Sequence, residues 1–211
     1  MKQLKINNFK KTMKKIIKET IENFTDDDLK NILWIYGRTG CGKTKLVNSL
    51  IKKLKKENKR ICPLSANRFL HIAVKLIINH EPLTSLISRC QNYDLLVLDN
   101  IDIELNNKSY TQKEIKWIVF EIIKNKKTKV VLISEKRPRK LPNLRLHTED
   151  CYYIRLKLPE YNLKINLLKN WARKKDILIP EKIIINIAKA SKNLFQLKGL
   201  FNKENGVRSL F

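Results

Sequence analysis

Residues 31–53 read NILWIYGRTGCGKTKLVNSLIKK and hold three of the five glycines in this 211-residue chain. The apolar run ILWIY is typical of a buried parallel strand, and the run after Thr44 predicts an amphipathic helix. Between them, Gly37–Thr44 fits the pattern G-x-x-x-x-G-K-[ST]. Glycine allows the backbone to wrap closely around phosphate oxygens, so that backbone amides and the start of the helix face the anion. The stretch therefore predicts a phosphate loop for a nucleoside triphosphate.

This loop predicts a set of nucleotide-binding residues and their cofactors. The predicted set is Gly37, Gly40, Cys41, Gly42, Lys43, Thr44 and Lys45. Lys43 is expected to reach the β- and γ-phosphates, while the Thr44 hydroxyl ligates Mg²⁺. ATP or ADP with Mg²⁺ are thus the predicted cofactors. An ordinary glycine-rich turn is the alternative, but the preceding strand and following helix are the context in which this motif binds phosphate.

A second group of candidate residues follows two later apolar runs. LLVLDN, residues 95–100, is predicted to be a strand that delivers Asp99 to the carboxyl edge of the sheet, where it would hold Mg²⁺. Asn100 stands where ATPases of this type often have a second acid, and an amide can orient water but cannot accept its proton. After VVLI, Ser134 and Glu135 are candidates to contact the γ-phosphate or the water, and a plain strand end is the alternative. The predicted catalytic residues are Asp99, Asn100 and Glu135.

Helix and strand patterns alternate through most of the chain. The strands are expected within residues 32–37, 60–65, 93–102 and 128–135, and the helices within 8–24, 45–59, 67–80 and 111–125. This alternation predicts an α/β fold with a doubly wound parallel sheet and helices on both faces. Three further helical patterns without a strand, at 161–176, 179–191 and 193–203, predict a small all-α appendage. We therefore expect a nucleotide-binding core over residues 1–158 and a helical subdomain over residues 159–211.

The chain carries 45 Lys and Arg against 20 Asp and Glu, a formal net charge of +25. Such a charge favours salt-sensitive association with DNA. The chain is also rich in Lys, Asn and Ile, which are all encoded by A/T-rich codons. A genome biased towards A and T would therefore raise the lysine content without selection for a ligand. A solvated lysine surface is the other interpretation of the charge. The four scattered cysteines indicate reduced thiols. No apolar run approaches the length of a membrane span, so we expect a cytoplasmic protein without a membrane partner.

Taken together, these motifs resemble the AAA+ core of the bacterial replication initiator DnaA and its shorter relative Hda, over roughly residues 8–203. WIYGRTGCGKTKL (34–46) resembles the phosphate loop of that family, and YDLLVLDNID (93–102) resembles its magnesium strand. YTQKEIKWIVFEI (110–122) resembles the helix that follows, and LISEKRPRKLPNL (132–144) the first sensor with its proline-rich exit. IPEKIIINIAKASKNLFQLKGLFN (179–202) resembles the lid. The resemblance implies a P-loop AAA+ parallel sheet with helices on both faces, plus a small C-terminal all-α lid.

The resemblance also implies partners. A DnaA/Hda-like protein would act in chromosomal replication initiation or its regulation, near the nucleoid, through AAA+ contacts with DnaA or with itself. Single-stranded DNA would be gripped by the segment 67–92, in which Arg68, Lys75 and Arg89 are candidate phosphate contacts. Gln3–Ile6 is faintly similar to the short motif with which Hda binds the sliding clamp, and an ordinary polar tail is the alternative.

Four departures from the family pattern bear on chemistry. Asn100 replaces the second acid of the magnesium strand, as in Hda. At the position where the family has an arginine in the lid, this chain has Phe195, and the nearest basic residue is Lys192. In the region where the family has an arginine finger, this chain has only Arg145. The chain stops after the lid, so the helix-turn-helix domain that reads duplex DNA is expected to be lacking. Losing these arginines would slow hydrolysis, which implies at most weak ATPase activity.

Other classes of P-loop protein remain open. A helicase loader or a transposition helper shares the phosphate loop and the magnesium strand. A nucleotide-locked scaffold without turnover differs from the DnaA/Hda interpretation only in chemistry. A small-molecule kinase would need an arginine-rich lid, and residues 160–202 hold only Arg173.

Overall fold

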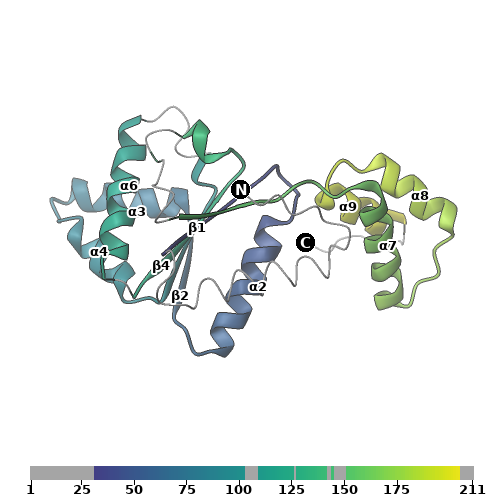
Figure 1. Cartoon of the computed structure of the whole chain (residues 1–211), viewed down its shortest axis with the longest axis horizontal. Helices are drawn as coiled ribbons and strands as arrows, with labels where there is room; N and C mark the ends of the chain where they lie inside the picture. The colour runs from purple at the N-terminus through teal and green to yellow at the C-terminus, as the bar shows by residue number, and fades with distance from the viewer. Residues whose placement is uncertain (1–30, 103–108, 126, 142–143, 145–150, 205–211) are drawn as a thin grey trace. The chain divides into compact units, whose positions relative to one another are not determined.

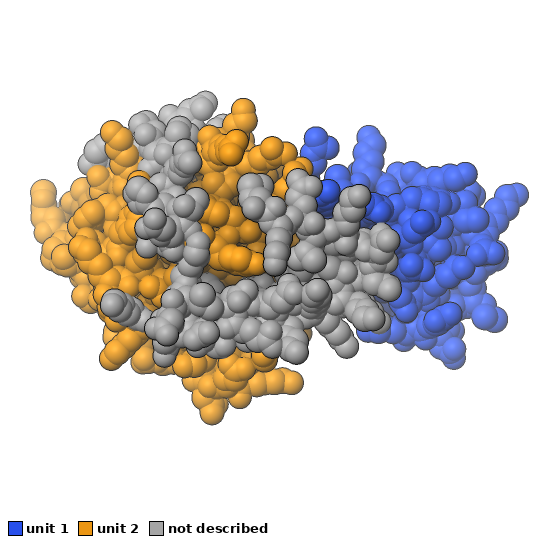
Figure 2. All heavy atoms as spheres, viewed as in Figure 1, with its two compact units in different colours: residues 1–16, 38–42, 157–211 blue, residues 17–37, 43–156 orange. Residues whose placement is uncertain are grey.

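The computed structural model describes residues 31–102, 109–125, 127–141, 144 and 151–204 (Figure 1). The predicted helix at 8–24, the clamp-like segment Gln3–Ile6 and Arg145 lie outside these residues. The described residues form two compact units. Residues 31–37 and 43–156 make the sheet unit, and residues 38–42 and 157–204 make the lid unit (orange and blue in Figure 2). The predicted division at residue 158 stays a proposal.

The sheet unit contains five parallel strands in the order β2-β3-β4-β1-β5. They are β1 Ile32–Tyr36, β2 Ile61–Ser65, β3 Leu95–Asp99, β4 Lys129–Ser134 and β5 Cys151–Arg155. Because all the strands are parallel, their carboxyl ends meet at one edge of the sheet, where ligands of open α/β sheets bind. This arrangement confirms the predicted P-loop parallel sheet.

Helices cover both faces of this sheet, as predicted. Helices α3 (Ala66–Ile78), α4 (Thr84–Gln91) and α6 (Ser109–Ile123) lie on one face, and α2 (Lys43–Lys56) lies on the other (Figure 1). Alternate strand residues explain this, since Trp34 and Leu98 join the cluster formed with α3, α4 and α6. Their neighbours Leu33 and Val97 are also buried, on the opposite side of the pleat. Each fully buried aliphatic side chain stabilises the fold by about 1.5–3 kcal/mol.

The two edge strands differ in how visible they are in the sequence. In β2, Pro63 pairs with Val97, and a residue without an N–H is tolerated there because β2 lies at the edge of the sheet. Strand β5 was not among the predicted strands. Only Cys151 and Ile154 of its five residues are buried, without a regular alternation, so the segment carries a weak local signal. It pairs with β1, where the ring centroids of Trp34 and Tyr153 lie 6.0 Å apart.

The lid unit contains the three predicted helices, α7 (Tyr161–Lys175), α8 (Glu181–Ala190) and α9 (Leu194–Glu204). Lys164 on α7 donates from its ammonium to the carbonyl oxygens of Ala188 (3.2 Å) and Ser191, at the end of α8. A cation in this place stabilises the negative end of the helix. Trp171 and Phe201 pack edge to face with ring centroids 5.6 Å apart, which joins α7 to α9.

In the part of the chain that the structure describes, no helix has the length and apolar character needed to cross a membrane.

Candidate nucleotide-binding site

The loop after β1 has the backbone that a phosphate loop requires. Gly37 N–H donates to the Ser134 carbonyl oxygen at 3.2 Å, which holds the start of the loop against the end of β4. Gly40 and Gly42 have φ angles of 74° and 101°, a region that side-chain-bearing residues rarely adopt. Cys41 is buried, and its N–H donates to the Arg38 carbonyl oxygen at 3.2 Å. The glycines at these two positions therefore serve the loop conformation.

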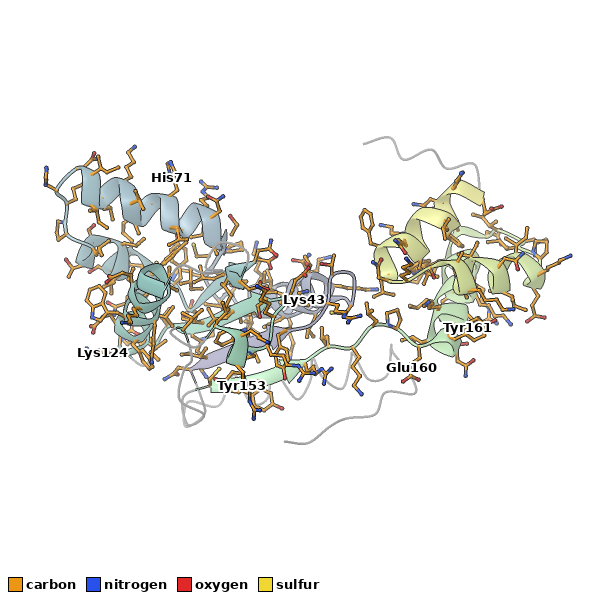
Figure 3. All side chains as sticks on the ribbon, turned by 90° about the horizontal axis from the view of Figure 1, so that it is seen from above. Lys43, His71, Lys124, Tyr153, Glu160 and Tyr161 are labelled. Atoms are coloured by element: carbon orange, nitrogen blue, oxygen red, sulfur yellow. The ribbon has the colours of Figure 1, made fainter. Side chains whose placement is uncertain are left out.

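Lys43 begins α2 and lies beside the sheet (Figure 3). Its ammonium donates to the Gly37 carbonyl oxygen at 2.6 Å, which folds the side chain back along the loop. No acidic residue occupies the first turn of α2, so the positive end of the helix dipole is not neutralised there. Thr44 and Lys45, next in the same turn, are exposed to solvent. This end of α2 is suited to an anion.

Asp99 ends β3 at the carboxyl edge of the sheet and is half-buried. Burial raises the pKa of the Asp99 carboxyl above its ordinary value, and the nearby charge of Asp102 adds to this. The Asn100 N–H, which donates to Asp99 Oδ1 at 2.8 Å, and the charge of Lys43 oppose the increase in pKa. A partly desolvated carboxylate close to a lysine fits a hard divalent cation bound with a phosphate.

Asn100 itself is exposed and has a left-handed backbone, with φ at 60°. Asparagine adopts this conformation more readily than most residues. The backbone therefore turns sharply at the position where related ATPases often have a second acid.

Ser134 and Glu135, the two candidates after β4, differ in their surroundings. The buried Ser134 hydroxyl accepts from Trp34 Nε1 at 2.8 Å and donates to the Lys136 carbonyl oxygen at 2.8 Å, so it is engaged within the fold. Glu135 is exposed and follows the strand that pairs with β1 as far as Tyr36 and Ser134. Of the two candidates, Glu135 is the one whose side chain faces solvent at this edge.

Residues 38–42 of the loop pack with α9 in the lid unit. The Leu194 N–H, in the first turn of α9, donates to the Gly40 carbonyl oxygen at 2.9 Å. Asn193 caps the helix, since its Oδ1 accepts from the Gln196 N–H at 2.9 Å. Phe195, which stands at the position expected for the lid arginine, is 80% exposed.

The sheet unit thus brings Gly37, Lys43, Asp99 and Glu135 to one edge, while the lid unit holds Gly40 and Cys41. Sequence reasoning missed two contributors, Asp102, whose carboxylate accepts from the turn after β4, and Asn193, the cap of α9. Asp102 could have been found as the second acid of the run DNID (99–102). Asn193 could have been found as a helix cap, because it precedes a predicted helix and is followed three residues later by Gln196.

We expect Asp99→Asn to weaken metal binding without lowering the stability of the ligand-free protein. The ionised carboxyl is penalised by burial, so at pH 7 the ligand-free variant should equal or exceed the wild type in free energy of unfolding. This gap should shrink as the pH falls through the raised pKa of Asp99, because the wild-type carboxyl then becomes neutral. Denaturant unfolding at several pH values, with and without Mg²⁺-ATP, measures both effects. A variant that keeps the full stabilisation by Mg²⁺-ATP would contradict a role for Asp99 as metal ligand.

Comparisons with known proteins show the family to which the chain belongs. The sequence profile of the bacterial DnaA ATPase domain matches residues 4–156. The chain is 27% identical over 190 residues to the chromosomal replication initiator protein DnaA of Pelobacter propionicus, covering 87% of this chain and 42% of that protein. It is 27% identical over 180 residues to DnaA of Bdellovibrio bacteriovorus, covering 82% of this chain and 38% of that protein. The chain therefore spans less than half the length of these curated relatives.

Solved structures show the same fold. AMPPCP-bound DnaA from Aquifex aeolicus superposes with a TM-score of 0.78 at 22% identity, covering 98% of this chain and 65% of that one. A replication initiator DnaA bound to AMPPCP and single-stranded DNA superposes with a TM-score of 0.77 at 24% identity, covering 93% of this chain and 60% of that one. At these identities the likeness concerns the fold.

Proposed function

The chain belongs to the family of bacterial DnaA ATPase domains, and from that premise we propose that it binds ATP and ADP with Mg²⁺ and acts in chromosomal replication initiation or its regulation. One observation carries the proposal. The Lys43 side chain lies along a glycine loop at the unneutralised start of α2, on the same sheet edge as the half-buried Asp99. That combination suits a triphosphate with its metal better than it suits any other common ligand.

Each residue of the site has a role in this proposal. The loop from Gly37 to Gly42 cradles the phosphates with its backbone, and Lys43 releases the Gly37 oxygen to bind phosphate instead. Thr44 and Asp99 hold Mg²⁺, which when bound neutralises phosphate charge. Glu135 and Asn100 orient the attacking water, and Lys45 contributes positive charge at the start of α2.

Hydrolysis in the isolated chain is proposed to be slow. Asn100 offers an amide where a base would accept the proton of water, and its backbone turns away from β3 at that residue. Phe195 is exposed where a lid arginine would stabilise charge, and arginines of this kind contribute 10³–10⁵ in rate in other phosphoryl-transfer enzymes. Contacts with DnaA or with a second copy of this chain would then supply the cation that completes the site.

We propose single-stranded DNA as a further ligand, bound on α3 and α4. A DnaA structure with the same fold is bound to AMPPCP and single-stranded DNA. Arg68 and Lys75 lie two turns apart on α3, both exposed, and Arg89 is exposed on α4. Residues seven apart share one face of a helix, so Arg68 and Lys75 can contact successive phosphates of one strand.

The double variant Arg68→Ala, Lys75→Ala is expected to weaken binding of an oligothymidine strand. If each side chain contacts one phosphate, the slope of log affinity against log salt should shrink by about 1.4. Lys52→Ala with Lys55→Ala, on exposed positions of α2, removes the same charge and serves as the matched control. Equal losses in the two double variants, measured by fluorescence anisotropy, would mean that net charge rather than this face binds DNA.

The proposed function is tested by ATP and ADP affinity with Mg²⁺ and by single-turnover hydrolysis, with and without DnaA from the same cell. Binding with turnover only in the presence of DnaA would identify a regulator whose site is completed by its partner. Binding without turnover in either case would identify a nucleotide-locked scaffold. Binding that responds to a replicative helicase and not to DnaA would favour the helicase-loader alternative. Absence of nucleotide binding would overturn the proposal.

A further inference from the structure

A buried carboxylate lies under the turn that carries Glu135. Asp102 is only 2% exposed, and its Oδ2 accepts hydrogen bonds from the N–H groups of Glu135 (3.0 Å) and Lys136 (2.8 Å). Hydrogen bonds to a charged acceptor are roughly twice as strong as those between neutral groups. One side chain from the segment after β3 therefore holds two consecutive backbone N–H groups of the turn after β4.

The same turn is also held from the side of the sheet. The Ser134 hydroxyl donates to the Lys136 carbonyl oxygen at 2.8 Å and accepts from Trp34 Nε1 at 2.8 Å. Gly37 N–H donates to the Ser134 carbonyl oxygen at 3.2 Å, so the turn is also tied to the first residue of the phosphate loop. With the backbone of the turn held by these contacts, the Glu135 side chain is exposed to solvent.

Packing alone does not account for Asp102. Within the described part of the chain, its second oxygen, Oδ1, is buried and has no hydrogen-bond partner. A buried carboxylate with an unsatisfied oxygen costs free energy, and an apolar residue of similar size would usually stabilise the fold more. The side chain therefore serves the geometry of the turn at some cost in stability.

Asp102 also connects this turn to the predicted metal ligand. It lies three residues after Asp99, and the left-handed backbone of Asn100 (φ 60°) together with the fully buried Ile101 directs the chain back towards β4. The carboxyl ends of β3 and β4 are neighbours in the sheet. One short segment thus holds both Asp99 and the turn that presents Glu135.

We propose that Asp102 is a positioning residue, which sets the place of Glu135 relative to Asp99 for ATP hydrolysis; this rests on the proposed nucleotide site. In that reaction, the water oxygen bonds to the γ-phosphorus as the bond from this phosphorus to the bridging oxygen of ADP breaks. The proton released by the water passes to solvent, and Glu135 orients the water for attack. Asp102 contacts neither the phosphates nor the water. Its effect is to keep the Glu135 backbone where the side chain reaches the water.

The test compares Asp102→Ala, Asp102→Asn and the control Val119→Ala in the full chain. Single-turnover hydrolysis and ADP affinity are measured with Mg²⁺ well below each unfolding midpoint, with DnaA added if the wild type requires it. Asp102→Ala should slow hydrolysis about 10–100-fold, because displacement of a reacting group by about 1 Å can cost that much, while ADP affinity changes less than about threefold. Asp102→Asn keeps one acceptor oxygen for the two N–H groups and should recover most of the rate.

Val119 lies on α6, is fully buried in the core and is not part of the turn, so Val119→Ala lowers stability without moving Glu135. Its hydrolysis rate per folded molecule should equal that of the wild type. The proposal is overturned if Asp102→Ala hydrolyses ATP at the wild-type rate, if Val119→Ala is slowed equally, or if the wild type binds ATP without any turnover. In the last case the proposed nucleotide binding stands. A wild type that binds no nucleotide would overturn both.

Discussion

Lys43→Ala is expected to lower ATP affinity at least about 100-fold, equivalent to about 2.7 kcal/mol. The Lys43 ammonium lies along the phosphate loop, 2.6 Å from the Gly37 carbonyl oxygen, and its charge is the one that can exchange this oxygen for phosphate. It also lowers the pKa of Asp99 through its charge. The variant should therefore lose the positive charge that contacts the phosphates in the proposed site.

Lys52→Ala is the matched control for this prediction. Lys52 is exposed on the same helix, α2, and its loss removes the same formal charge far along the helix from the loop. Its ATP affinity should stay within about threefold of the wild type, since charges on an exposed surface are screened within about 10 Å at moderate salt. Both are measured by equilibrium titration with a fluorescent ATP analogue in Mg²⁺. An ATP affinity of Lys43→Ala equal to that of the wild type would contradict the assignment of this segment as a phosphate loop.

Gly40→Ala is expected to destabilise the lid unit by about 1–3 kcal/mol and to weaken nucleotide binding. The φ angle of Gly40 is 74°, which strains any residue with a Cβ. A Cβ built there would also lie 2.7 Å from Cγ of Asn193. That side chain cannot move freely, because its Oδ1 accepts from the Gln196 N–H and caps α9. The variant must therefore distort the loop, the cap or both.

Gly199→Ala, in the same unit, is expected to raise stability where Gly40→Ala lowers it. Gly199 lies inside α9, and a Cβ added there meets nothing within 4 Å. Alanine in a helix interior should stabilise the protein by about 0.4–1 kcal/mol. Denaturant unfolding of both variants, followed by ATP titration, measures the contrast. Similar unfolding midpoints for Gly40→Ala and the wild type would mean that the loop does not need the left-handed conformation.

The predicted elements that matched the structure are those with strong local patterns. The apolar runs of β1, β3 and β4 are buried on both faces, so each stands out without knowledge of its neighbours. Helices α2 and α8 have buried residues at helical spacing, which is visible in the same way. The loop between β1 and α2 stands out as a candidate phosphate loop because its glycines, lysine and threonine are close together in sequence.

The features that were missed depend on contacts between distant residues. Strand β5 is half-exposed and becomes a strand through pairing with β1. The engagement of the Ser134 hydroxyl depends on Trp34, one hundred residues earlier. The left-handed backbone at Asn100 has no distinct sequence signal, because asparagine also occurs in ordinary conformations.

The order of the strands β1 to β4 and the choice of the proposed phosphate-binding residues follow from the sequence, because hydrophobic periodicity and a contiguous loop motif are local properties. Which acid supports the β4 turn, and which helix packs against Gly40, depends on the folded chain. Asp102 reaches Glu135 across 33 residues of sequence, and Leu194 reaches Gly40 across more than 150. Such contacts form once the sheet has set the register of its strands and the lid helices have packed, so no local pattern encodes them.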